Sequence, residues 1–403
     1  MKEKYLEENK WWVSPFNFIG EVRGEFNLPP KVEIHDATLR DGEQTPGIVF
    51  RKEHKVQIAQ MLDEVGIERI EAGMPAVSDE DFEAIKAISQ LGLKARIYTF
   101  ARAFTVDIDK AIDCGANGVV IEIPIGYPKL KYQFGWTWED VARKSVECIS
   151  YAKGKNLHVV YFPYDTTRAR DEDLTNVLTR IMRDSPPDSI GLIDTMGCAL
   201  PEAIKYLVKK IKKITKLPVE IHTHNDFGMA VATELAAVTA GAEVVHGCVN
   251  GLGERTGNAA IEELMVGLHI LLGLETHYKL DRIGQLCKLV RDLSGIQPAN
   301  NKPVIGEGNY TRESGIGVDL VMKNPLTMFA TAPQIFGREG KVVLGKKSGK
   351  ASITYTLEKL GIKNVQDEEV AEILKEVKTR GTEKRALLSL DEFREIVGRS
   401  LKS

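Results

Sequence analysis

The sequence predicts an α/β protein built on a TIM (β/α)8 barrel, followed by a helical C-terminal extension that could act as a lid. From about residue 31 to residue 275, short runs rich in β-branched residues alternate with amphipathic stretches of helical spacing. Eight such pairs in about 245 residues match this barrel in number and in size. A doubly wound parallel sheet is the alternative, but it does not normally need eight regular units.

The expected strands are short and apolar: 32–36, 69–73, 96–100, 118–123, 158–163, 189–194, 219–222 and 243–249. The expected helices carry apolar residues on one face: 52–65, 79–91, 106–115, 138–154, 171–183, 200–214, 228–240 and 258–272. Glycines that mark helix C-termini precede four of the strands, at Gly66, Gly92, Gly115 and Gly241.

We expect residues 31–275 to form the catalytic barrel. Outside this range the alternation of strands and helices stops. We expect residues 276–403 to form a helical linker, lid and dimerisation subdomain, with a Pro-, Gly- and Asn-rich linker at 297–310. Its expected helices are 281–296, 350–360, 367–379 and 391–400. Residues 1–30 form an N-terminal extension, whose apolar segment Trp11–Phe16 is expected to pack on the barrel or on a partner subunit.

Composition narrows the functional class. The chain has 403 residues, 43% of them hydrophobic, and its 54 basic and 57 acidic residues give a net charge of −3. A large core can form, and no basic stripe points to nucleic acid. The five cysteines are scattered without a Cys-x-x-Cys pair, which argues against a zinc finger or a disulfide framework. No apolar run reaches membrane-spanning length, so no membrane partner and a cytoplasmic location are expected.

Two histidines one residue apart, His222 and His224, end the seventh expected strand. Residues i and i+2 of a strand point to the same side, so both imidazoles face one spot. That arrangement suits two ligands of one metal ion, although the pair alone is weak support because core histidines are common.

A second segment supplies a carboxylate. Asp41 follows the first strand beside the fixed positive charge of Arg40, and Gly42 permits a tight turn. Two neutral imidazoles and a carboxylate suit a divalent ion that keeps positions open for substrate. A local ion pair between Arg40 and Asp41 is the alternative interpretation.

The predicted fold brings these groups to one rim. In a TIM barrel the active site lies at the C-terminal ends of the strands, and closure places strands one, seven and eight side by side. The polar residues at these ends are Asp41, Glu71, Thr195, His222, His224 and the loop 250–258. Their convergence, from segments far apart in the chain, is the strongest sign of an active site in the sequence.

Four segments carry a resemblance to a known family: 36–44 (DATLRDGEQ), 222–226 (HTHND), 250–258 (NGLGERTGN) and 344–350 (LGKKSGK). Together they resemble the 2-isopropylmalate, homocitrate and citramalate synthases of the DRE-TIM metallolyase superfamily. The resemblance implies a metal-dependent Claisen condensation of acetyl-CoA, or another acyl-CoA, with a 2-oxo acid in amino-acid biosynthesis. It also implies a homodimer.

The resemblance assigns roles residue by residue. The divalent metal, which could be Mg, Mn, Co or Zn, would be held by Asp41, His222, His224 and Asn258. Arg40 would stabilise the oxyanion, Thr195 would bind the substrate carboxylate, and Gln44 and Glu71 would orient these groups.

Three positions depart from the family. The histidine expected after Glu313–Ile316 is Gly317, the tyrosine expected later is Met328, and the segment after strand five reads Phe162-Pro163-Tyr164-Asp165 instead of Ser-Pro-Glu-Asp. We expect Phe162 and Tyr164 to line an altered substrate pocket. The catalytic base must then differ, and Glu313 is favoured over the other candidates, which are Tyr310, Asp319 and Tyr164.

Two other functions are the alternatives to a synthase. A lyase that cleaves a 3-hydroxyacyl-CoA, similar to 3-hydroxy-3-methylglutaryl-CoA lyase, would carry a cysteine in the loop after strand eight. That loop reads Gly253-Glu254-Arg255-Thr256 here, and Cys248 lies before it. A non-catalytic scaffold would have lost its metal ligands. The sequence leaves the identity of the 2-oxo acid open.

Overall fold

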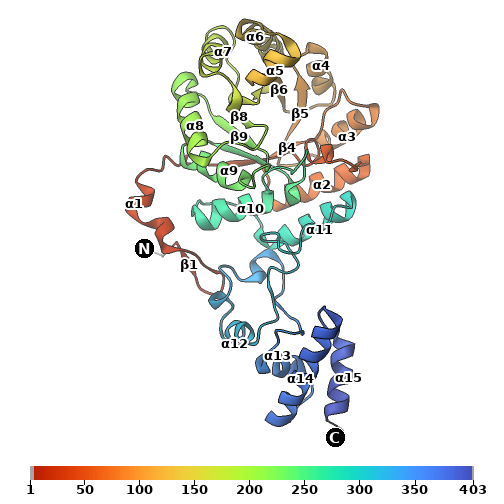
Figure 1. Ribbon diagram of the computed structural model, residues 1–403. Coiled ribbons are helices and arrows are strands. Elements are labelled where there is room, and N and C mark those ends of the chain that lie inside the picture. Colours follow the sequence, from red (N-terminus) through yellow and green to blue (C-terminus); the bar gives the residue numbers. More distant parts are fainter. Residues whose placement is uncertain (1–3, 402–403) are drawn as a thin grey trace. The chain divides into compact units, whose positions relative to one another are not determined.

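A computed structural model describes residues 4–401, which divide into two compact units. One unit comprises residues 16–297, and the other combines residues 4–15 with residues 298–401. The larger unit contains the closed barrel, and the smaller one contains the C-terminal helices (Figure 1).

The barrel of the larger unit confirms the predicted fold class. Its eight parallel strands neighbour one another in the order β10-β3-β4-β5-β6-β7-β8-β9. The strands are β3 (Glu33–Asp36), β4 (Arg69–Glu71), β5 (Arg96–Arg102), β6 (Gly118–Pro124), β7 (His158–Tyr164), β8 (Ser189–Asp194), β9 (Val219–Thr223) and β10 (Val244–Gly247). Each lies at one of the predicted positions, within a few residues at the ends.

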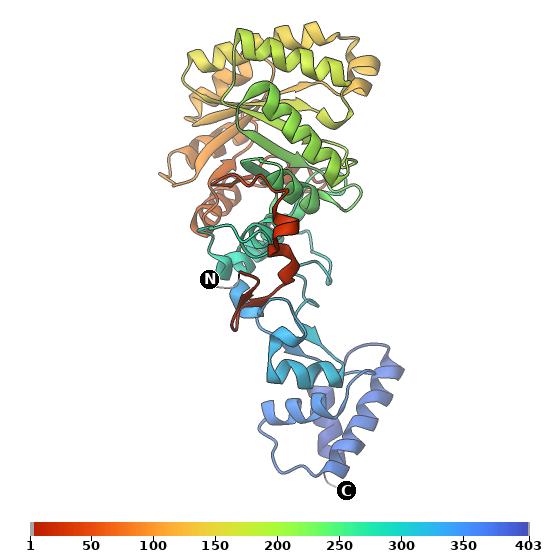
Figure 2. The same cartoon turned by 90° about the vertical axis from the view of Figure 1, so that its left-hand side faces the viewer.

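Helices cover the outside of the barrel, and the yellow and yellow-green ones lie at the top of the view in Figure 2. They are α2 (Lys52–Val65), α3 (Asp79–Ser89), α4 (Thr105–Asp113), α6 (Trp138–Gly154), α7 (Asp171–Asp184), α8 (Pro201–Thr215), α9 (Ala230–Thr239), α10 (Ile261–Val266) and α11 (Ile283–Ser294). Two short helices are α1 (Gly20–Arg23) and α5 (Tyr127–Lys129). Helix α2 ends at Gly66, whose φ of +103° lets its N–H reach the carbonyl of Leu62.

The helix predicted at 258–272 is wrong in its first three residues. Asn258 forms an isolated β-bridge with His224, and Ala260 forms another with Cys248. Since this segment pairs with the ends of two barrel strands, helix α10 begins only at Ile261, and a π-helical turn follows it over Gly267–Leu271.

The barrel interior holds both apolar and charged side chains. An apolar cluster comprises Tyr98, Phe100, Val120, Val160, Phe162 and Ile193. Elsewhere, buried Glu220 accepts hydrogen bonds from Arg69 at 2.6 Å and Ser189 at 2.6 Å, and its other oxygen lies 2.9 Å from His246 Nε2. These contacts offset the free energy of burying both charges.

One part of this charged region resembles a metal site but is better explained by packing. His35, Glu220 and His246 bring ligand atoms within 4.8 Å of one another. The rings of His35 and His246 are stacked, with centroids 4.2 Å apart and planes only 4° from parallel. Imidazole lone pairs lie in the ring plane, so two parallel rings cannot both direct one at the same ion.

The smaller unit has its own core. Its helices are α12 (Gly315–Lys323), α13 (Lys350–Lys359), α14 (Asp367–Lys384) and α15 (Leu390–Ser400). Two small sheets pair β1 (Leu6–Glu7) with β2 (Trp11–Trp12), and β11 (Thr311–Arg312) with β12 (Lys341–Val342). Residues such as Ile353, Ile373 and Phe393 are fully buried between the last three helices. Helix α12 is an element that the sequence did not predict.

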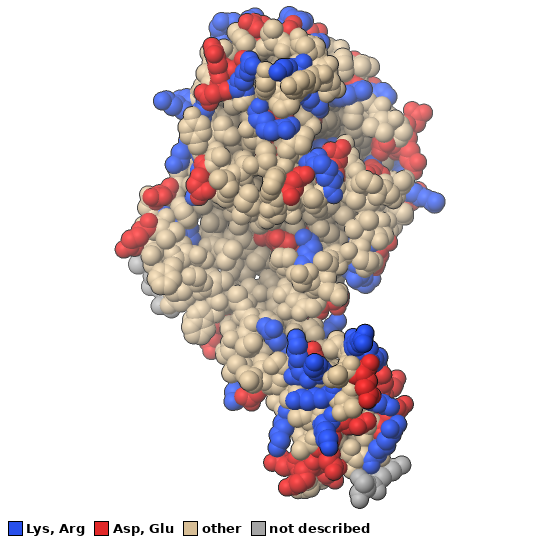
Figure 3. Space-filling model, viewed as in Figure 1, with Lys and Arg blue, Asp and Glu red and all other residues tan. Residues whose placement is uncertain are grey.

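Charged residues of both signs are interspersed on the face shown in Figure 3. This agrees with the small net charge of −3. Within residues 4–401, no helix is both long enough and apolar enough to cross a membrane.

Candidate active site

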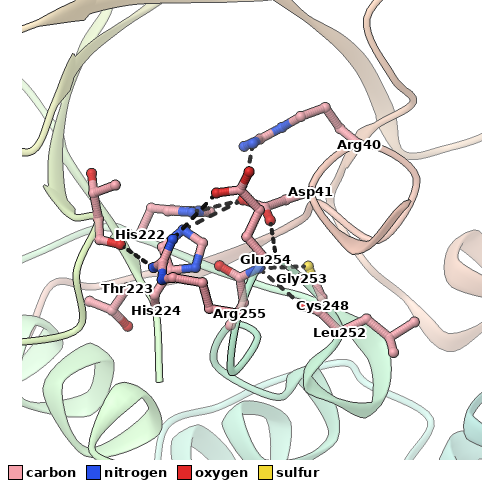
Figure 4. Close-up of polar contacts among 12 residues, drawn as sticks. Arg40, Asp41, His222, Thr223, His224, Cys248, Leu252, Gly253, Glu254 and Arg255 are labelled. Carbon is pink, nitrogen blue, oxygen red and sulfur yellow. Dashed lines mark hydrogen bonds and ion pairs between the residues drawn. The ribbon is translucent and has the colours of Figure 1, made fainter. Parts of the chain in front are cut away.

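Three predicted ligands converge at the C-terminal ends of β3 and β9. His222 lies in β9 and His224 follows it, while Asp41 lies in the loop after β3. The Nε2 atoms of His222 and His224 are 3.4 Å and 3.7 Å from Asp41 Oδ2. Figure 4 shows the Asp41 carboxylate between Arg40 and the two imidazoles. The three ligand atoms lie within 4.8 Å of one another, which is the spacing of donors around one ion.

The charge states of these groups suit a cation. Burial lowers the pKa of His222, and it lowers the pKa of His224 to about 4, so both imidazoles are neutral at pH 7. Burial alone would raise the pKa of Asp41, but Arg40 and the two histidines hold it well below its usual range. The site therefore offers two neutral nitrogen donors and an ionised carboxylate.

Asn258 adds an amide oxygen. Its Nδ2 donates to the carbonyl of Leu252 at 3.0 Å, whereas its buried Oδ1 has no partner among residues 4–401. Gly253 makes room for this side chain: its φ is +143°, and a Cβ there would lie 2.1 Å from Asn258 Nδ2 and 3.0 Å from Asp41 Oδ1. The orphaned oxygen beside the carboxylate and imidazoles fits a fourth ligand position.

Arg40 is held by two carboxylates. Its Nη1 donates to Asp41 Oδ2 at 3.0 Å, and its Nε donates to Glu71 Oε1 at 2.8 Å. The guanidinium also lies 4.4 Å from the centroid of the Phe100 ring. Burial would raise the pKa of Glu71, but Arg40 and His35 lower it to about 2, so Glu71 is ionised and anchors Arg40.

A cavity of about 230 Å³ opens beside these groups. The predicted residues that line it are Arg40, Asp41, Gln44, Phe162, Tyr164, Thr195, His222 and His224. Glu71 lies behind Arg40 and is fully buried, and Asn258 is not among the lining residues. The structure thus places the predicted substrate residues and most of the predicted metal ligands around one space.

Five further residues line the cavity: Phe100, Glu122, Lys129, Ile193 and Glu254. Glu254 lies in the loop 250–258 that was predicted to reach this rim, whereas the other four were not predicted. Glu122 was detectable, because it is the one charged residue in the apolar run 119–125 (VVIEIPI). Burial raises its pKa to about 7, against the opposing effect of Lys129. The Lys129 ammonium lies 3.5 Å from the centroid of the Tyr164 ring.

The candidate bases Glu313, Tyr310 and Asp319 belong to the smaller unit, where each has a partner. Glu313 Oε1 accepts a hydrogen bond from the backbone N–H of Lys347 at 2.8 Å. Tyr310 shares a hydrogen bond of 2.7 Å with Thr331, and Asp319 accepts one of 2.9 Å from Lys323. Gly317 and Met328, the two departures in this unit, lie close together: a Cβ on Gly317 would be 3.6 Å from Met328 Cε.

Comparison with known protein families gives two matches. The HMGL-like family model matches residues 31–290, and the model of the homocitrate synthase post-HMGL domain-like family matches residues 304–385. The first match spans the barrel, and the second lies in the smaller unit.

Several curated relatives align over most of the chain. Homocitrate synthase AksA of Methanopyrus kandleri is 39% identical over 96% of both chains. The probable 2-isopropylmalate synthase of Ignicoccus hospitalis is 41% identical over 93% of this chain and 94% of its own. The putative (R)-citramalate synthase CimA of Archaeoglobus fulgidus is 41% identical over 90% of this chain and 74% of its own.

Among solved structures, the HMG-CoA lyase of Bacillus subtilis is similar in fold. It aligns with a TM-score of 0.60 and 18% identity over 68% of this chain and 97% of its own. At that identity the likeness concerns the barrel architecture alone.

Proposed function

This chain belongs to the HMGL-like family, in the group that contains homocitrate, 2-isopropylmalate and citramalate synthases, and from that membership we propose that it is an acyl-CoA:2-oxo acid C-acyltransferase. It joins the methyl carbon of acetyl-CoA to the keto carbon of a 2-oxo acid, and hydrolysis of the thioester then releases CoA. The observation that carries this proposal is the identity of 39–41% to such synthases over at least 90% of the chain.

The proposed metal ligands are Asp41, His222, His224 and Asn258, and their donor set fits a divalent cation such as Mg, Mn, Co or Zn. The bound ion would polarise the keto group and hold the carboxylate of the 2-oxo acid. Neutral imidazoles and an ionised carboxylate are the protonation states that such binding requires, and the site has both at pH 7.

Arg40 would stabilise negative charge that develops on the keto oxygen. Its guanidinium is buried and fixed by Asp41 and Glu71, so it is aligned before substrate binds. Preorganised charge of this kind lowers the barrier because nothing must reorient during the reaction.

Thr195 would hold the substrate carboxylate, and Gln44 lines the same cavity. The backbone N–H of Asp165 donates to Thr195 Oγ1 at 2.9 Å, which fixes the hydroxyl as an acceptor. Its own proton remains available to a substrate oxygen, because within residues 4–401 we find no acceptor for it. Phe162 and Tyr164 would contact the side chain of the acid.

A homodimer is a further part of this proposal, supported by the family resemblance, and light scattering of the purified protein measures it. The sequence favours Glu313 of the smaller unit as the base, but its Oε1 already accepts a hydrogen bond from the Lys347 N–H. The lyase alternative is disfavoured because the loop from Gly253 to Thr256 contains no cysteine.

The proposal is tested by incubating the protein and Mg or Mn with ¹³C-labelled acetyl-CoA and each of pyruvate, 2-oxoisovalerate, 2-oxoglutarate and oxaloacetate. Mass spectrometry should find one acid enlarged by two labelled carbons. No labelled product with any acid, together with cleavage of a 3-hydroxyacyl-CoA, would favour the lyase.

A further inference from the structure

One wall of the cavity lies across the barrel from the proposed metal ligands. Those ligands come from β3 and β9, which flank β10, and β6 stands opposite β10 in the closed order of eight strands. Glu122 belongs to β6 and lines the same cavity. A substrate held between the metal ligands and this wall would therefore meet the Glu122 carboxylate.

Glu122 differs from the other carboxyl groups that line this cavity. Asp41 is engaged by Arg40 and by both proposed histidine ligands. Glu254 has a side chain that is 50% exposed and lies 3.3 Å from Arg255. Glu122 is partly buried, and among the described residues none donates a hydrogen bond to it or forms an ion pair with it.

The other titratable groups that line the cavity are less suited to take up a proton. The two histidines of the cavity, within the described part of the chain, are the proposed metal ligands His222 and His224. Burial raises the pKa of Tyr164 to about 12, so its phenol stays protonated. Lys129 carries a positive charge on the Tyr164 ring. A free carboxylate at Glu122 is the group in this space best able to act as a base.

The charges that face Glu122 keep its proton exchangeable. Burial raises its pKa to about 7, Lys129 and Arg40 oppose that rise, and Asp41 and Glu71 add to it. For a carboxyl group whose pKa is near the pH, both protonation and deprotonation cost little free energy.

We propose that Glu122 is the catalytic base of the condensation, which removes a proton from the methyl group of acetyl-CoA. This inference rests on the proposed function. The C–H bond breaks, the proton passes to a Glu122 oxygen, and the electron pair forms the enolate of the thioester. The enolate carbon then bonds to the keto carbon of the 2-oxo acid, whose oxygen takes the displaced electron pair and afterwards a proton. Water hydrolyses the thioester and releases CoA, and Glu122 returns its proton to solvent.

The test compares Glu122→Gln with a matched control, Glu147→Gln, which neutralises an exposed carboxylate on helix α6 that does not line the cavity. Three quantities are measured in each protein: the rate of CoA release, the loss of deuterium to solvent from trideuteroacetyl-CoA, and the dissociation constant of the 2-oxo acid. Deuterium loss is measured with the 2-hydroxy analogue of the acid, which has no carbonyl to attack.

In Glu122→Gln, both rates should fall by about a hundredfold or more, as for removal of a general base. The dissociation constant of the 2-oxo acid should stay within about threefold of wild type, because the lost interaction belongs to the transition state. Glu122→Asp should recover part of both rates, and Glu147→Gln should match the wild type.

Two results would overturn this role. Deuterium loss at the wild-type rate in Glu122→Gln would place the base elsewhere. Equal loss of catalysis and of 2-oxo acid binding would make Glu122 a substrate-binding residue instead. Absence of CoA release in the wild-type protein would instead contradict the proposed function itself. The assignment of Glu122 as its base would then fall as well.

Discussion

Glu71 on β4 fixes Arg40 from the neighbouring strand: the Nε of Arg40 donates to Oε1 of Glu71 at 2.8 Å, and both side chains are almost fully buried. Replacing Glu71 by Gln would leave the Arg40 guanidinium with only one carboxylate partner, Asp41. Breaking a buried ion pair of this kind costs about 3–5 kcal/mol. Urea unfolding at pH 7 should show Glu71→Gln less stable than wild type by an amount approaching that range.

The same pair predicts a pH dependence. The folded-state pKa of Glu71 is lowered from 4.5 to about 2. A lowered carboxyl pKa contributes stability that is complete above pH 4.5 and is lost as the pH falls from 4.5 towards 2. The difference in unfolding free energy between wild type and Glu71→Gln should therefore shrink over this interval. A difference that is constant down to pH 2 would contradict the assigned ionisation.

Removal of either histidine ligand should weaken metal binding. His222→Ala and His224→Ala each remove one nitrogen ligand. The affinity for Mn²⁺ should fall by more than about a hundredfold, which is more than substitution of a residue that only contacts the ligands would cause. Titration followed by electron paramagnetic resonance measures this directly. His277→Ala is the control, because that side chain is 60% exposed and lies on the outside of the barrel unit. Wild-type affinity in His222→Ala would refute the proposed ligand set.

Gly253→Ala should damage the same site although it replaces none of the proposed ligands. The new Cβ would lie 2.1 Å from Asn258 Nδ2, so Asn258 must move away from Asp41, and Mn²⁺ affinity should fall. Gly135→Ala is the matched control: its φ is also positive, at +64°, but no atom lies within 4 Å of the added Cβ. Equal effects of the two substitutions would mean that backbone strain, and not the contact with Asn258, is responsible.

The pH dependence of the condensation rate should follow the ionisation of Glu122. A base must be ionised, so kcat/KM should rise with pH and level off above about 7, the raised pKa of this carboxyl group. Lys129 lowers that pKa, whereas Asp41 and Glu71 raise it. Lys129→Met should therefore shift the acidic limb of the profile to higher pH. An unshifted limb in this variant would assign it to another group.

Periodic patterns explain why most of the fold could be predicted. Helix α2 has the predicted bounds, 52–65, because its apolar spacing and the glycine that ends it are both local signals. The start of α10 was not predicted, because Asn258 pairs with His224 and such a long-range β-bridge leaves no trace in the local sequence. Helix α12 was missed because two glycines in its nine residues lower its helix propensity.

The site residues that lie in recognisable motifs could be predicted from the sequence. Glu122 could not, because its place in the site depends on which face of its strand points inward. Asp41, His222 and His224 stand in polar segments at strand ends. Glu122 stands inside a strand, two residues after Val120, which points into the barrel interior. Alternation along β6 therefore turns Glu122 inward too. That deduction needs the inward face of the strand, which the apolar run 119–125 does not reveal because both faces of a barrel strand are buried.

Metal-dependent condensation of acetyl-CoA with a 2-oxo acid is tested most directly by the release of free CoA thiol. The protein is incubated with acetyl-CoA, Mg or Mn, and each of pyruvate, 2-oxoisovalerate, 2-oxoglutarate and oxaloacetate. We predict release that depends on one acid, disappears in His222→Ala and persists in His277→Ala. No release with any of the four acids, from protein that still binds Mn²⁺, would contradict this activity.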